Sequence, residues 1–259
     1  MPTLAPALRE CGYWLHRYRR VWRGTLVIDV VNPLLFLTAL GAGLGSLVDA
    51  NAPASLDDIS YLSYLAPGLL AAATMQTVYV ETAGPVMVSA RRTGNYRAAA
   101  ATPLDSTDIL HGHLLFVVCR GAVTGSLFTA VACVFGALPA ARCAPLAAEA
   151  ALISAAFAAP IAAWAITVTR PARLTALLRF VLMPLYMCSG TFWPVTQLGD
   201  WAVPVAHLSP LWHGVELTRA TALGTARPGP TLVHVLALAA CALTGLALAR
   251  RTYRRCLHA

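Results

Sequence analysis

Three charged residues lie within long apolar stretches and are the first candidates for chemistry in this sequence. Asp29, Glu81 and Arg120 each interrupt an otherwise apolar run. A charge at the centre of a bilayer costs at least about 2.5 kcal/mol, so such a side chain should face protein or water and be paired. We expect Arg120 to pair with Glu81 or Asp29, where the pair would fix helix packing or line a substrate entry. The alternative is that each side chain extends singly to the lipid headgroups.

Ser189 and His234 lie in different apolar stretches and could imitate the serine and histidine of an intramembrane protease. Those proteases use a G-x-S-G serine, and here Met187 occupies the first glycine position. The sequence also lacks an H-E-x-x-H zinc motif. We therefore predict a protein that is not an enzyme and binds no metal.

The chain contains no lysine, because all 19 of its basic residues are arginine. A phosphate-binding loop of the G-x-x-x-x-G-K-[ST] type needs its lysine to contact the nucleotide. We therefore expect no cofactor on this chain and assign any ATP-Mg to a partner. The seven cysteines have no C-x-x-C spacing, and most lie in apolar runs, where cysteine behaves as a small hydrophobe.

The composition indicates a membrane protein. Of the 259 residues, 58% are hydrophobic and 12% charged, whereas a soluble domain carries about 25% charged residues. The net charge of +8 does not indicate nucleic-acid binding, because the arginines lie at the ends of apolar runs. Six runs are near or above the ~20 residues that cross a bilayer as a helix. The predicted spans are Gly24–Leu47, Leu62–Val80 or slightly beyond, Leu114–Leu138, Ala147–Val168, Leu174–Trp193 and Thr231–Leu248.

Residues 1–23 precede the first span and are predicted to form an amphipathic helix in the membrane interface. Its apolar face contains Trp14 and residues at three- and four-residue spacing from it, and its other face contains Glu10 and the arginines. The remaining residues, 24–259, are predicted to form one transmembrane domain.

Arginine placement predicts the orientation, because cytoplasmic loops are rich in basic residues. If the N-terminus is cytoplasmic, 15 of the 19 arginines lie on that side, three lie outside and Arg120 lies within a span. Both termini are then cytoplasmic, as in a multi-pass protein of a bacterial plasma membrane. The polar segment 89–112 is an inner loop. The outer segment 191–230 is half-apolar and interrupted by prolines, which predicts a re-entrant hairpin packed on protein.

Small residues and prolines predict local packing. Gly121 and Gly125 form a G-x-x-x-G pair that allows two helices to approach closely, within one chain or across a dimer. Pro160 and Pro184 predict kinks in the fourth and fifth spans.

Five segments, in order, resemble the type-2 ABC exporter permeases, and in particular the branch that includes nodulation-factor (lipo-oligosaccharide) and daunorubicin-type drug exporters. They are NPLLFLTALGAGLG from Asn32, YLAPGLLAAATM from Tyr64, RRTGNYRAAAATPLDSTDILHGH from Arg91, PLYMCSGTFWPVTQL from Pro184 and LSPLWHGVELTR from Leu208. Asp105 departs from the pattern, since serine is common after T-P-L.

The resemblance implies six spans, an interfacial N-terminal helix, an inner coupling helix and an outer hairpin. It also implies a homodimer or heterodimer of permeases in which each half docks one ABC ATPase subunit. The residues that it assigns to ATPase docking are Arg17, Arg20, Arg91, Arg92, Asn95, Tyr96, Arg97, Thr102 and Asp105. Those that it assigns to the outer corner are Ser189, Gly190, Phe192, Trp193 and Pro194.

The cargo is expected to be lipid-like, a glycolipid or a hydrophobic drug, because the spans contain few polar residues, and membrane lipid is an expected partner. An ion-gradient-driven carrier is the main alternative; it would favour mid-membrane acids and repeated halves, and no repeat is visible. A scaffolding subunit without its own pathway is a third possibility.

Overall fold

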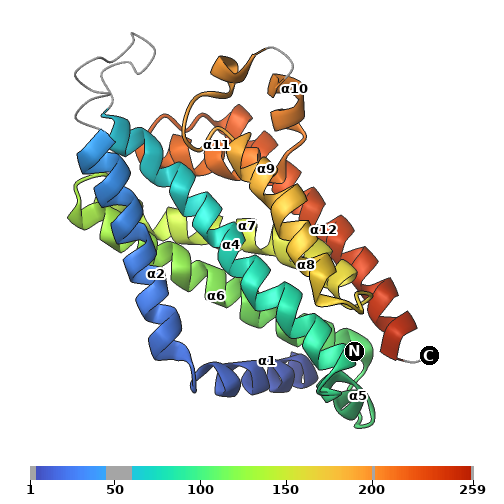
Figure 1. Ribbon diagram of the computed structural model, residues 1–259. Coiled ribbons are helices and arrows are strands. Elements are labelled where there is room, and N and C mark those ends of the chain that lie inside the picture. Colours follow the sequence, from blue (N-terminus) through green and yellow to red (C-terminus); the bar gives the residue numbers. More distant parts are fainter. Residues whose placement is uncertain (1–3, 45–59, 200–201, 258–259) are drawn as a thin grey trace.

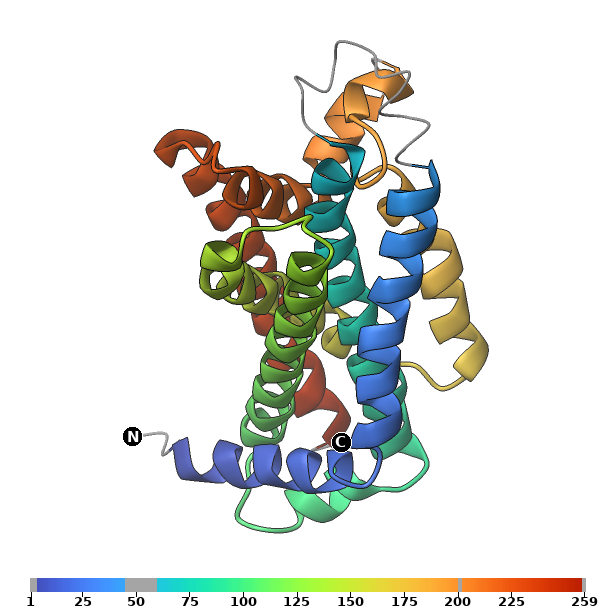
Figure 2. The ribbon, with the colours of Figure 1, turned by 90° about the vertical axis from the view of Figure 1, so that its left-hand side faces the viewer.

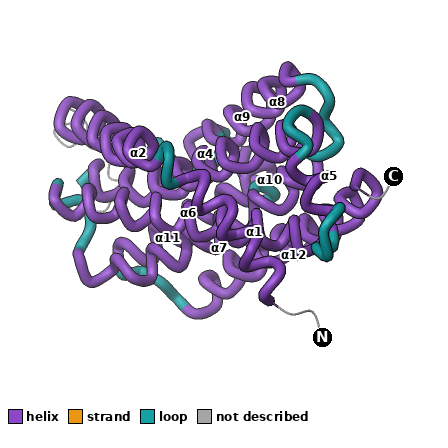
Figure 3. The backbone as a smooth tube through the Cα atoms, turned by 90° about the horizontal axis from the view of Figure 1, so that it is seen from below, coloured by secondary structure: helices purple, strands orange, loops and turns teal. Residues whose placement is uncertain are grey.

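The computed structural model describes residues 4–44, 60–199 and 202–257, and within these ranges the chain is helical with no strand (Figures 1 and 3). The predicted all-α class is therefore confirmed. The elements are α1 (Leu4–Tyr18), α2 (Trp22–Phe36), η1 (Leu37–Leu44), α4 (Tyr61–Arg91), α5 (Asn95–Ala100), α6 (Ser106–Val134), η3 (Ala140–Arg142), α7 (Cys143–Ala165), α8 (Pro171–Leu177), η4 (Leu178–Leu182), α9 (Met183–Met187), η5 (Val195–Leu198), α10 (Ala202–His207), α11 (Pro210–Leu223) and α12 (Pro228–Leu257).

Length and composition identify several helices that can cross a membrane. In the described part of the chain, α6, α12 and the segment Ala140–Ala165, which contains α7, are each long and apolar enough. A fourth candidate consists of Pro6–Tyr18 and Trp22–Ala39, which are bent by 79° at the break between them. The count of six spans remains a prediction.

The inner loop is shorter than the predicted segment 89–112. Helix α4 continues through residue 91 rather than ending near Val80, and α6 begins at Ser106 rather than near Leu114. Helix α6 starts early because Asp105 and Asp108 form a capping box that satisfies the first free backbone N–H groups. The segment between the two long helices is therefore only 92–105, and it contains α5.

Two further helix limits differ from the prediction. The expected fifth span is broken: α8 leads into the π-helical η4 and then α9, which ends at Met187 instead of Trp193. Helix α12 begins at Pro228 and continues to residue 257, past the predicted end at Leu248, so the outer connection ends at Arg227. The end of the predicted first span, residues 45–47, lies outside the described residues.

The two ends of the bundle carry different elements. Helix α1 lies across one end, beside α5 and near the last turns of α12 (Figures 1 and 2). Helices α10 and α11 lie at the opposite end (Figure 1). Between them, α7 packs against α4, α6, α11 and α12, which makes it the central helix of the bundle.

Glycines allow α7 to approach its neighbours. A Cβ atom at Gly125 of α6 would collide with Ala150 of α7, and one at Gly121 would collide with Ser154. The predicted close approach of these glycines therefore occurs within one chain. On another side of α7, a Cβ atom at Gly245 of α12 would lie 2.5 Å from Cδ of Pro160.

Candidate functional site

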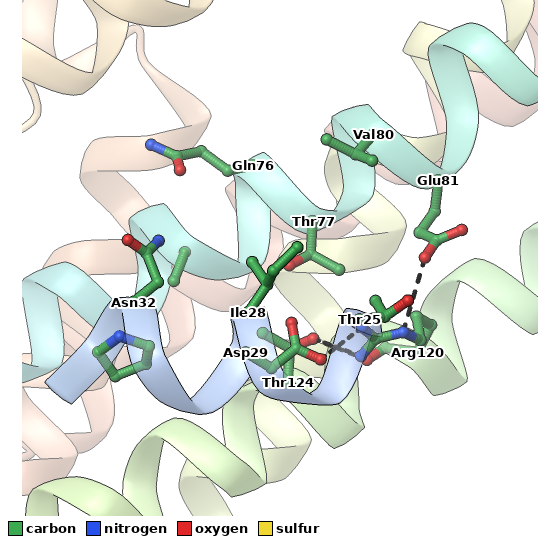
Figure 4. Close-up of a pocket in the computed structure, with 12 residues that line it drawn as sticks. Thr25, Ile28, Asp29, Asn32, Gln76, Thr77, Val80, Glu81, Arg120 and Thr124 are labelled. Atoms are coloured by element: carbon green, nitrogen blue, oxygen red, sulfur yellow. Dashed lines mark hydrogen bonds and ion pairs between the residues drawn. The ribbon is translucent and has the colours of Figure 1, made fainter. Parts of the chain in front are cut away.

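A cavity of about 220 Å³ lies between α2, α4 and α6 (Figure 4). Polar side chains of Asn32, Gln76 and Thr77 line it together with the apolar side chains of Ile28 and Val80. Ile28 is 64% exposed and Val80 is 65% exposed. A polar lining beside exposed apolar groups suits a molecule with a polar and an apolar part.

Arg120 of α6 occupies the wall of this cavity between two carboxylates. Its Nη2 donates a hydrogen bond to Oδ2 of Asp29, and its Nε lies 3.7 Å from Oε1 of Glu81 (Figure 4). Its Nη1 also donates to the hydroxyl of Thr124 at 2.8 Å. The sequence left open whether these charges pair, and the structure brings Arg120 together with both acids. Because two carboxylates surround one guanidinium, the cluster carries one excess negative charge when both acids are ionised.

The backbone of Glu81 connects this charge cluster to the end of the bundle that carries α1 and α5. The carbonyl oxygen of Glu81 lies 3.0 Å from Nε2 of His113, and the His113 Nδ1 lies 2.6 Å from the Tyr96 hydroxyl. The Glu81 carbonyl oxygen can only accept, so Nε2 of His113 carries the ring hydrogen and donates to it. In the neutral imidazole Nδ1 is then the acceptor, and the Tyr96 hydroxyl donates to it.

Trp14 of α1 completes this arrangement, which we call the His113 junction (Trp14, Tyr96, His113 and the Glu81 carbonyl). The Trp14 ring stacks on the His113 imidazole with ring centroids 4.0 Å apart and planes 7° apart. Four elements, α1, α4, α5 and α6, therefore meet around one imidazole.

The face of α1 that packs on protein differs from the predicted one. Glu10, assigned above to the polar face, is buried and accepts a hydrogen bond of 2.9 Å from Nε1 of Trp14, whereas Leu8 and Leu15 are exposed. The reason is steric: α1 crosses α6 at Gly112, where a Cβ atom would lie 2.6 Å from the Cβ of Glu10. Helix α1 therefore has one edge packed against α6 and another edge on which Leu8 and Leu15 are exposed.

The residues predicted to dock an ATPase divide into an exposed and an internal set. Arg17, Arg20, Arg91, Arg92, Arg97, Thr102 and Asp105 are exposed, whereas Tyr96 is buried and Asn95 is partly buried. The Asn95 amide donates to the Tyr13 hydroxyl of α1, and Thr102 donates to the Ala99 carbonyl at 2.6 Å. Asp105 serves to cap α6, as described above. The exposed arginines lie on or directly after α1 and α4 and on α5, at one end of the bundle, and we call them the basic surface.

The predicted outer corner is joined to α4 and α11 by Arg219. Its Nη2 donates to the Gly190 carbonyl at 2.7 Å, and its guanidinium lies 4.0 Å from the centroid of the Tyr64 ring. Gly190 has φ of 78°, a conformation that favours glycine. The Ser189 hydroxyl is buried and donates to the Tyr186 carbonyl at 2.9 Å.

The other corner residues follow the same turn. Phe192 contacts the Tyr186 ring with centroids 5.1 Å apart, Trp193 is 41% exposed, and Pro194 precedes η5. His234, considered above with Ser189, instead contacts His213, with their Nδ1 atoms 2.9 Å apart.

Sequence reasoning missed several residues that the structure places in key contacts. His113 was included only as the end of a loop segment, although its position next to a glycine could have suggested a close helix crossing. Glu149 was not counted among the charges within spans, yet it lies on α7 and accepts a hydrogen bond from Thr221 of α11. Glu149 was overlooked because it lies close to Ala147, the expected start of the fourth span.

The chain is similar in sequence to known proteins over most of its length. Residues 13–223 match the family model described as "ABC-2 type transporter". The chain is 28% identical to Nodulation protein J of Sinorhizobium fredii over 245 residues, covering 87% of this chain and 86% of that protein. It is 26% identical to the inner membrane transport permease YadH of Escherichia coli K12 over 220 residues, covering 81% of this chain and 80% of that protein.

Proposed function

Because the chain belongs to the ABC-2 type transporter family, whose members are membrane-spanning permeases, we propose that it is the transmembrane subunit of an ATP-driven exporter. The ATPase is a separate cytoplasmic chain, and two permease subunits, identical or related, form the complete transporter. The observation that carries this proposal is the continuous series of contacts from α5 through the His113 junction to the charged cavity.

The proposed topology has six crossings: α2 with η1, α4, α6, α7, the broken segment α8–α9, and α12. Helix α1 lies in the inner interface, and α10 with α11 forms the outer hairpin. The distribution of arginines supports this orientation, because the exposed basic surface lies at the end that carries α1 and α5. Both termini are then cytoplasmic.

In the proposed cycle the ATPase binds the basic surface formed by the exposed arginines. Closure of the ATPase subunits on ATP displaces α5 and α1 together, because Tyr96 and Trp14 contact the same imidazole. His113 transmits this displacement to α4 at Glu81, and Glu81 and Arg120 together border the cavity. The coupling is mechanical, because the sequence has no lysine for a nucleotide-binding loop. ATP then acts on the permease only through contacts with the ATPase that differ between the two states.

The proposed cargo is an amphipathic molecule, such as a glycolipid, another lipid-like compound or a hydrophobic drug. The cavity supports this class because amide and hydroxyl groups of Asn32, Gln76 and Thr77 can bind a polar headgroup. The exposed Ile28 and Val80 can contact an acyl chain or another apolar group. Export of a drug would confer antibiotic resistance.

The proposal is tested by purifying the protein from native membranes and identifying the ATPase that accompanies it. We expect the triple variant Arg91→Ala, Arg92→Ala, Arg97→Ala to lose this ATPase and its transport. Arg227→Ala, an exposed arginine preceding α12 in the outer connection, is the matched control and should keep both. The assignment is wrong if the triple variant retains docking and transport, or if the protein moves its cargo without any ATPase, as a secondary carrier would.

A further inference from the structure

Two cysteines from adjacent helices lie in contact at the turn between α6 and α7. Cys133 is in the last turn of α6, and Cys143 is the first residue of α7. Their Sγ atoms are 3.8 Å apart, and both side chains are partly exposed. A disulfide has an S–S distance of about 2.05 Å, so the two sulfurs need to close by roughly 1.8 Å.

The backbone of the turn holds these two thiols together. Gly136, with φ of 71°, donates its N–H to the Cys133 carbonyl at 3.0 Å, and Ala137 donates to the Ala132 carbonyl at 2.9 Å. Ala137 and Leu138 are buried and anchor the turn on the bundle. At the start of α7, the backbone N–H of Arg142 donates to the Pro139 carbonyl at 3.0 Å, so backbone hydrogen bonds hold the turn near both cysteines.

The turn also lies on the oxidising side of the membrane in the proposed orientation, on which this inference depends. Helix α6 begins next to α5 at the cytoplasmic end and finishes at this turn, whose residues 139–142 are exposed. Extracytoplasmic compartments of bacteria favour disulfides, whereas the cytoplasm keeps thiols reduced.

We propose that Cys133 and Cys143 are the site of an intramolecular disulfide that joins the outer ends of α6 and α7. The oxidant is an extracytoplasmic thiol–disulfide oxidoreductase in its disulfide form. The thiolate of one cysteine attacks that disulfide and forms a mixed disulfide, which the thiolate of the second cysteine resolves. The permease loses two protons and two electrons, and the oxidoreductase leaves as a dithiol.

The bond joins α6, which borders the charged cavity, to α7, which does not line that cavity. Helix α6 carries Arg120 and His113, and α7 is the central helix of the bundle. A covalent link at their outer ends keeps α6 in place while α2 and α4 move against it. The predicted role of the disulfide is therefore to stabilise the position of α6, the helix that carries Arg120.

The redox state can be read on the wild-type protein in its native membrane. Free thiols are blocked with N-ethylmaleimide during lysis in denaturing detergent, disulfides are reduced, and the released thiols are labelled with maleimide-polyethylene glycol. We expect the wild type to gain two polymer units, and Cys133→Ser and Cys143→Ser to gain none. Cys241→Ser, which changes a partly buried cysteine of α12, is the matched control and should still gain two. A wild type that gains none, or a control that also loses the labels, overturns the assignment.

A second measurement separates failure of the bond from failure of the orientation. Intact cells are treated with a membrane-impermeant maleimide, with or without an impermeant phosphine reductant, and the labelled cysteines are identified by mass spectrometry. Labelling of Cys143 only after the reductant supports the disulfide. Full labelling without reductant overturns the disulfide and leaves the proposed function standing. Labelling only after the cells are permeabilised contradicts both the disulfide and the proposed orientation.

Discussion

Removal of the cation from the buried charge cluster tests the physical basis of the cavity. Asp29 is only 7% exposed, and Arg120→Met removes the cation that pairs with it. Breaking a buried pair by removing one partner costs about 3–5 kcal/mol of the free energy of unfolding. In Asp29→Asn, Arg120 keeps Glu81 and Thr124 as partners, so we expect a smaller loss of about 1–3 kcal/mol.

The double variant Asp29→Asn, Arg120→Met gives the decisive comparison. It contains neither charge of the pair, so its loss of stability should fall short of the sum of the single losses by at least about 1 kcal/mol, within the range for contacting residues. The free energy is measured by denaturant titration in lipid–detergent micelles, and transport is measured in vesicles. Arg142→Met, an exposed arginine of η3, is the control and should change stability by less than about 0.5 kcal/mol. Strictly additive losses would refute the ion pair as a stabilising unit.

Three other substitutions test separate contacts. Gly112→Val should displace α1, because a side chain at this position collides with Glu10. Protease cleavage between α1 and α2 should then be faster than in the wild type, and an unchanged cleavage rate would contradict the packing. Asp105→Ala removes the cap of α6 and should lower stability by about 1 kcal/mol; Asp105→Asn, which can still cap, should lose less, and equal losses would count against the cap. Arg219→Gln should lose the cation over the Tyr64 ring and lower the free energy of unfolding by about 1–2 kcal/mol. An unchanged unfolding midpoint would show that the outer corner does not depend on this residue.

The sequence predicted the all-helical class and the pairing of the charges within the spans. Both follow from the cost of placing unpaired polar groups in hydrocarbon. Arg120 was the clearest case: an arginine within a span needs a partner, and only two acids were near enough in the expected topology. Which acid it would contact depended on the rotation of α2 and α4, and the structure places it between the two.

Apart from the pairing of Arg120, contacts between distant segments were not predictable from one sequence. Glu10 was grouped with the arginines on the polar face because it is charged, yet Gly112 lets α1 approach α6 and bury it. His113 had no special spacing, because its partners, Trp14, Tyr96 and the Glu81 carbonyl, come from three other helices. The predicted start of α6 was wrong for a local reason. Asp105 and Asp108 cap the helix, so α6 begins within the segment that was expected to be a loop.

The contact between Gly245 and Pro160 restricts how this protein can vary. The proline ring occupies the space that a side chain on α12 would need, so a larger residue at position 245 is acceptable only after the proline is replaced. In related permeases the two positions should therefore change as a pair. A library that randomises both should recover compensating combinations that neither position yields when it is mutated by itself.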